Sequence, residues 1–161
     1  MSLIGQPVTI LGAGVAGLAA ARALALRGAQ VTVLEQADAI REVGAGLQIS
    51  PNGAAVLRGL GLQAKLDAAS TRADAVQLID GPTGEGVTRL DLARLRPGHG
   101  YHFLHRADLI DLLLNGAKAA GVTLRLLSRA AEIDLSGPAP AVVLEGGERL
   151  ETPLLIGGAT T

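Results

Sequence analysis

A glycine-rich turn between two short β-branched segments constrains the fold of this chain more than any other feature of the sequence. The turn is Gly12-Ala13-Gly14-Val15-Ala16-Gly17, and it follows the apolar segment 7–11 (PVTIL). A helical pattern covers residues 15–27, and residues 30–34 (QVTVL) have the composition of a buried strand. Residues 7–34 therefore predict a right-handed strand–helix–strand unit of a Rossmann-like α/β fold.

Each position of this turn has a physical role in holding a diphosphate. Gly12 permits the tight turn, Gly14 leaves the backbone open to a pyrophosphate, and Gly17 lets the helix pack close to the sheet. Val15 and Ala16 open the helix, where free backbone N–H groups and the helix dipole favour an anion. The turn thus predicts a dinucleotide site, and the alternative is a glycine-rich turn that holds no ligand.

An acidic residue at the end of the second strand indicates which dinucleotide is preferred. Glu35 lies 18 residues after Gly17. Its carboxylate can accept hydrogen bonds from both hydroxyls of an adenosine ribose. The same charge would repel a 2′-phosphate, so the sequence favours FAD or NAD over NADP.

Composition excludes several other classes of protein. The 161 residues carry 14 Lys+Arg against 15 Asp+Glu, so there is no basic excess for binding nucleic acid. The chain has no cysteine, which excludes a disulfide scaffold, a thiol nucleophile and a Cys-ligated metal. There is no apolar run of about 18 residues and no signal-peptide pattern, so we expect a cytoplasmic protein without a membrane partner.

The remaining chain predicts further strands and helices, with residues 35–49 irregular. The expected elements are helices at 51–60 and 107–120, a hairpin within 74–92, a strand at 122–127, a small meander within 132–152 and a last buried strand at 153–156. Three histidines, His99, His102 and His105, are spaced by three residues. We predict no metal site there, because that spacing places strand side chains on alternate faces.

Three further stretches carry a resemblance to a known family. They are Val33-Leu34-Glu35-Gln36 with Arg41 and residues 44–52 (GAGLQISPN), then residues 57–62 ending in Gly61-Leu62, and His105-Arg106-Ala107-Asp108-Leu109. In this order they resemble the FAD-dependent aromatic-ring monooxygenases, which include salicylate, 4-hydroxybenzoate and 6-hydroxynicotinate hydroxylases. The resemblance covers nearly all of residues 6–157.

The resemblance implies that FAD is the cofactor and adds residues to its site. Gln36 belongs to the ribose segment, Arg41 and Gln48 lie along the extended cofactor, and Arg106 contacts it from the start of a helix. Ala130 resembles the position where the backbone meets the adenine. The alternatives are a solvated loop charge at Arg41 and a surface arginine at Arg106.

The implied reaction uses NAD(P)H and O2 to hydroxylate a small aromatic substrate. The family continues its last strand into Gly-Ala-Asp-Gly, whereas this chain ends Gly157-Gly158-Ala159-Thr160-Thr161. We therefore expect residues 1–161 to be an N-terminal portion, inactive alone, in which residues 74–92 begin the substrate-side sheet. We nominate no catalytic residue, and we expect poor FAD retention and self-association. Another FAD/NAD oxidoreductase and a non-catalytic dinucleotide-binding module are the alternative functions.

Overall fold

The computed structural model describes residues 2–40, 45–95, 97–98 and 100–158. The chain divides into two compact units. The first unit comprises Met1–Glu42 and Ile110–Thr161, and the second comprises Val43–Leu109. No helix among the described residues is long and apolar enough to cross a membrane.

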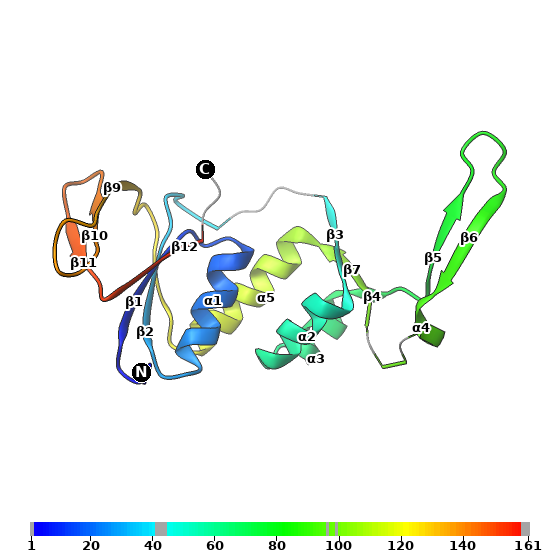
Figure 1. Ribbon diagram of the computed structural model, residues 1–161, viewed down its shortest axis with the longest axis horizontal. Coiled ribbons are helices and arrows are strands. Elements are labelled where there is room, and N and C mark those ends of the chain that lie inside the picture. The colour runs from blue at the N-terminus through cyan, green and yellow to red at the C-terminus, as the bar shows by residue number, and fades with distance from the viewer. Residues whose placement is uncertain (1, 41–44, 96, 99, 159–161) are drawn as a thin grey trace. The chain divides into compact units, whose positions relative to one another are not determined.

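A parallel sheet forms the centre of the first unit (Figure 1). Its strand order is β12 (Leu154–Gly157), β1 (Pro7–Leu11), β2 (Gln30–Leu34) and β8 (Thr123–Arg125), and all neighbouring strands are parallel. Helix α1 (Val15–Ala25) connects β1 to β2. The predicted strand–helix–strand unit and the α/β fold class are therefore confirmed.

Aliphatic side chains between the sheet and its helices form the core of this unit. The fully buried members include Ile10 and Val33 from the strands, Leu18 from α1, and Ile110 and Leu113 from α5 (Arg106–Ala119). The Arg22 guanidinium of α1 also donates a hydrogen bond to the Gly116 carbonyl of α5. The two helices are thus linked by a polar contact.

A small antiparallel sheet packs against the end of β2. Its strands are β9 (Ala130–Asp134), β10 (Ala141–Leu144) and β11 (Arg149–Glu151), which confirms the predicted meander. Leu34 of β2 forms an apolar cluster with Val142 and Leu144. This cluster fixes the small sheet next to the residues that follow β2.

The last strand differs from the sequence prediction in its burial. The predicted strand at 153–156 forms as β12, but Leu154 is 41% exposed and no residue of the strand is fully buried. The reason is its place at the edge of the sheet, where the described residues provide a neighbour, β1, on one side only.

The second unit contains a three-stranded antiparallel sheet and a helix pair. The strands are β3 (Gly46–Ile49), β7 (His102–His105) and β4 (Thr71–Arg72), and the helices are α2 (Pro51–Gly59) and α3 (Gln63–Ala69). The prediction that residues 35–49 are irregular is wrong at Gly46–Ile49. That strand forms by pairing with β7, more than fifty residues later, and a local pattern does not reveal such a partner.

A two-stranded hairpin extends the second unit, as the sequence predicts. It pairs β5 (Ala75–Ile79) with β6 (Gly86–Asp91), and the short helix α4 (Leu92–Leu95) follows. Val76 and Leu90 are paired across the hairpin, and both are about half exposed, at 45% and 50%. The hairpin therefore presents apolar side chains to solvent.

A buried histidine connects α3 to β7 in the second unit. His102 is only 3% exposed, and its Nδ1 lies 2.8 Å from the Ser70 hydroxyl. Because that hydroxyl donates to the Leu66 carbonyl at 2.6 Å, its oxygen accepts a hydrogen bond from Nδ1–H. Burial lowers the pKa of His102 below its usual 6.5, Asp67 opposes the shift, and Arg72 adds to it.

We predict that the stability of the chain depends on pH through His102. In the unfolded state this histidine takes up a proton at a higher pH than in the folded state. Its stabilising contribution is therefore complete above about pH 6.5 and is lost as the pH falls toward the lower folded pKa. Urea unfolding at about pH 7.5, 6.5 and 5.5 measures this loss. His102→Asn keeps a donor for Ser70 and should flatten the profile, whereas an equal slope in both proteins would contradict the assignment.

Candidate dinucleotide site

Two positions in the turn between β1 and α1 accommodate only glycine. Gly12 has φ +93°, and its N–H donates to the Leu34 carbonyl of β2 at 2.8 Å. A Cβ atom added at Gly17 would lie 2.0 Å from the Gly12 carbonyl oxygen. Gly17 therefore lets the first turn of α1 approach the end of β1 closely.

The N-terminus of α1 is open to an anion. Gly14 is the N-cap residue in extended conformation, no side chain caps the helix, and its first turn carries no acidic residue. A Cβ atom added at Gly14 would meet no heavy atom within 4 Å. The start of this helix thus combines unshielded backbone N–H groups of Val15 and Ala16 with room for a diphosphate.

Glu35 lies beside this turn and contacts it directly. One carboxylate oxygen accepts the backbone N–H of Ala13 at 2.8 Å, and the other accepts that of Ala37 at 3.0 Å. The side chain is partly buried. A carboxylate has about four lone-pair positions, so two such bonds leave each oxygen able to accept a hydroxyl as well. The residue is therefore fixed at the turn and still suited to binding a ribose.

The segment after β8 lies against the residues that follow β2, and sequence reasoning missed it. Glu35 N–H donates to the Arg125 carbonyl at 2.8 Å, and Ser128 N–H donates back to the Glu35 carbonyl at 2.8 Å. Leu127 N–H donates to the Ala37 carbonyl at 3.0 Å. The predicted strand at 122–127 and the predicted adenine contact at Ala130 pointed to this region. The strand ends at Arg125, and the last two predicted residues form this connection instead.

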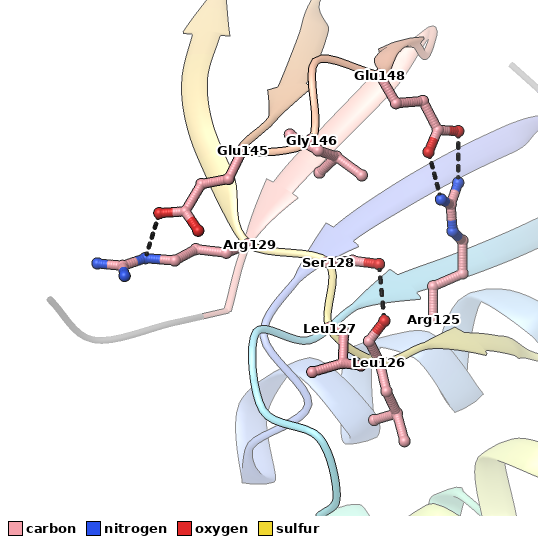
Figure 2. A pocket seen from close by; sticks show the side chains of 9 residues that line it. Arg125, Leu126, Leu127, Ser128, Arg129, Glu145, Gly146 and Glu148 are labelled. Carbon is pink, nitrogen blue, oxygen red and sulfur yellow. Dashed lines mark hydrogen bonds and ion pairs between the residues drawn. The ribbon is translucent and has the colours of Figure 1, made fainter.

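A cavity of about 430 Å³ adjoins this segment (Figure 2). Its lining includes two ion pairs: Arg125 binds Glu148 through two hydrogen bonds of 3.0 and 2.6 Å, and Arg129 lies 3.4 Å from Glu145. The hydrogen bonds between Arg125 and Glu148 lower the pKa of Glu148 and raise the pKa of Arg125. Both arginines are therefore paired within the chain.

The other predicted site residues fall into three groups. Gln36 is exposed directly after Glu35, and Ala130 is partly buried at the start of β9, so both lie in the first unit. Gln48 and Arg106 lie in the second unit; both are exposed, and the Gln48 side-chain oxygen accepts a hydrogen bond from the Tyr101 hydroxyl at 2.8 Å. Arg41 lies outside the described residues.

The histidines are arranged as the strand spacing predicts. His102 is buried and His105 is exposed on β7, so the two side chains lie on opposite faces. His99 lies outside the described residues. The described part of the chain contains no group of three or more His, Cys, Asp or Glu side chains suited to a metal ion.

Comparisons with known proteins show the family. The family described as "FAD binding domain" matches residues 6–158. The chain is 41% identical over 120 residues to 3-amino-4-hydroxybenzoate 2-monooxygenase of Streptomyces cremeus, a match that covers 73% of this chain. It is 40% identical over 118 residues to 3-hydroxybenzoate 6-hydroxylase of Polaromonas naphthalenivorans, with 71% of this chain covered. In both matches the chain spans 30% of the relative's length.

Solved structures agree with this result. The tetrameric form of 2-methyl-3-hydroxypyridine-5-carboxylic acid oxygenase superposes with a TM-score of 0.82 at 30% identity. The superposition covers 94% of this chain and 38% of the oxygenase. The resemblance to FAD-dependent aromatic-ring monooxygenases is thus confirmed, while the individual site residues remain predictions.

We predict different effects for alanine at Gly14 and at Gly17. Gly17→Ala should lower the free energy of unfolding by about 1–3 kcal/mol, because the new Cβ overlaps the Gly12 carbonyl. Gly14→Ala has room for its Cβ and should change stability by less than about 1 kcal/mol, yet weaken ADP binding at the helix N-terminus about tenfold. Urea unfolding and NMR titration with ADP measure both effects. Equal losses of stability in the two variants would show that the turn is not built as described.

Proposed function

We propose, because the chain belongs to the FAD binding domain family, that its first unit binds the ADP portion of FAD. The observation that carries the proposal is the contact between the Glu35 carboxylate and the Ala13 N–H, next to a helix start without a side-chain cap. This arrangement provides an acceptor for ribose hydroxyls directly beside donors for a diphosphate.

The proposed roles follow from the chemistry of each residue. Gly12, Gly14 and Gly17 shape the turn, and the N–H groups of Val15 and Ala16 bind diphosphate oxygens. Glu35 orients the ribose, with Gln36 exposed beside it. Ala130 contributes its backbone near the adenine.

Three residues complete the proposed cofactor site from elsewhere in the chain. They are Arg41, Gln48 and Arg106, and their roles rest on the family resemblance. An arginine suits a diphosphate, because its guanidinium is always charged and can donate two parallel hydrogen bonds.

For the whole protein we propose a flavin-dependent monooxygenase that hydroxylates a small aromatic compound with NAD(P)H and O2. The names of the relatives support this class, since one acts on 3-amino-4-hydroxybenzoate and another on 3-hydroxybenzoate. Bound FAD would supply the redox chemistry, and the described residues would bind and orient it. No catalytic residue is assigned within residues 1–161.

We also propose a domain organisation, self-association and a cellular location for this chain. Residues 1–161 serve as the N-terminal portion of the FAD-binding monooxygenase domain, and the hairpin at 75–91 begins its substrate-side sheet. The exposed Val76 and Leu90 of that hairpin favour self-association of this chain. A cytoplasmic location is consistent with a co-substrate such as NAD(P)H.

Binding of FAD fragments to the 161-residue chain tests the proposal. We expect ADP to shift the amide signals of the Gly12–Gly17 turn and of Ala37, and FMN to leave them unchanged at equal concentration. Glu35→Gln should weaken ADP binding by about 1–3 kcal/mol, because the amide cannot replace both carboxylate acceptors. Glu132→Gln removes an exposed carboxylate of β9 and serves as the matched control. If ADP leaves these signals in place, the proposed ribose and diphosphate sites are wrong.

Arg106 gives a separate test of the cofactor site. Arg106→Lys keeps the positive charge but loses the planar fork of donors, so FAD affinity should fall about tenfold if the guanidinium binds the diphosphate in two parallel bonds. Arg94→Lys makes the same change on the short helix α4 and should leave FAD affinity unchanged. Equilibrium dialysis with FAD measures both variants, and an unchanged affinity in Arg106→Lys would identify Arg106 as a surface residue.

A further inference from the structure

The aromatic side chains of the chain lie together in the second unit, at the three-stranded sheet. The sequence contains one tyrosine, one phenylalanine and no tryptophan. Tyr101 directly precedes β7 and Phe103 lies within it, and their ring centroids are 5.8 Å apart at an interplanar angle of 57°. Aromatic rings commonly fill a core, but Phe103 is 40% exposed. The position of this pair at an exposed face indicates a role other than core packing.

Backbone contacts hold Tyr101 in place. Its carbonyl accepts a hydrogen bond from the Ala73 N–H at 2.8 Å, which extends the pairing of β4 with β7 by one step. The preceding residue, Gly100, lies against the buried His102, because a Cβ atom added to Gly100 would lie 2.0 Å from the His102 Nε2. The backbone that carries the Tyr101 side chain is therefore fixed by the chain itself.

The Tyr101 hydroxyl determines how the Gln48 amide is oriented. Gln48 lies on β3, at an exposed position directly opposite Phe103 in the antiparallel pairing. The Tyr101 hydroxyl donates to the Gln48 Oε1 at 2.8 Å. An amide oxygen only accepts hydrogen bonds, so this bond leaves Nε2 and its two N–H donors on the side of the amide away from the tyrosine.

The amino group of Gln48 is open to a ligand. Within the described parts of the chain, Gln48 Nε2 forms no hydrogen bond. Phe103, across the strand pair, offers no polar side-chain atom. The two N–H groups of Gln48 are thus donors with a set orientation, and they suit a ligand that carries a hydrogen-bond acceptor.

We propose that Tyr101 is a positioning residue of the cofactor site, whose hydroxyl holds Gln48 so that its amino group donates to an acceptor atom of bound FAD. The inference rests on the proposed function, in which Gln48 belongs to that site, and adds Tyr101 to it. FAD has suitable acceptors, including the carbonyl oxygens and ring nitrogens of its flavin. Without the hydroxyl the amide can turn over and present its oxygen, which repels such an acceptor.

A double-mutant cycle in the 161-residue chain, measured by equilibrium dialysis with FAD, tests this proposal. Tyr101→Phe removes the hydroxyl and keeps the ring beside Phe103, so the dissociation constant of FAD should rise about threefold to fivefold. Gln48→Met removes the whole amide at similar length and should raise it about fivefold to tenfold. Because Tyr101 acts through Gln48, the double variant should match Gln48→Met within about twofold. Thr88→Val, which removes an exposed hydroxyl of β6 in the same unit, is the matched control and should leave FAD affinity unchanged.

The side-chain NH2 signals of Gln48 in NMR spectra give a second readout that needs no ligand. Tyr101→Phe should shift these signals in the free chain, because the amide loses the donor to its oxygen. Its melting temperature should stay within about 2 °C of the wild type, since the ring contact is kept. Unchanged Gln48 signals, or a larger loss of stability, would overturn the positioning role.

The outcomes of the cycle separate the inference from the proposed function. If the factors of the two single variants multiply in the double variant, the hydroxyl acts independently of the amide and the inference is wrong. If Gln48→Met weakens FAD binding and Tyr101→Phe does not, the inference fails while the role proposed for Gln48 stands. If Gln48→Met binds FAD as the wild type does, or the wild-type chain does not bind FAD, the inference and that role fail together. The titration of Glu35→Gln with ADP still tests the first unit by itself.

Discussion

The close approach of α1 to the end of β1 is the contact on which the first unit depends. This approach is possible because Gly17 has no Cβ. A Cβ atom at this position would lie 2.0 Å from the Gly12 carbonyl oxygen. Helix α1 therefore begins at the turn, at the carboxyl edge of the sheet. A helix that begins there without a capping side chain leaves its first N–H groups available to an anion.

The same turn determines what surrounds this anion site. Ala13 donates its N–H to Glu35, so the carboxylate is held at the turn. Glu35 in turn pairs through its backbone with both Arg125 and Ser128. Three segments that are distant in sequence are thus joined by a short series of hydrogen bonds, one to the Glu35 carboxylate and two to its backbone. A ligand that touches the turn and Glu35 also lies near the segment after β8.

Sequence alone predicts the parts of this arrangement that depend on local chemistry. The glycine spacing predicts β1, α1 and β2, and the position of Glu35 predicts a carboxylate beside the turn, because both follow from neighbouring residues. Strand β3 and the connection at Leu127 are different, since each is defined by hydrogen bonds to residues far along the chain. The left-handed conformation of Leu127 has no signal in its residue type, because a leucine rarely adopts it. Edge exposure of β12 likewise follows from the strand order, which local patterns do not contain.

The proposed ADP site lies wholly within the first unit. The turn, Glu35, Gln36 and Ala130 all belong to that unit, so one folded body is enough to place them. The backbone N–H groups of Ala13 and Ala37 both donate to the Glu35 carboxylate, which holds this side chain at the turn before any ligand binds. Affinity for ADP therefore measures the first unit by itself.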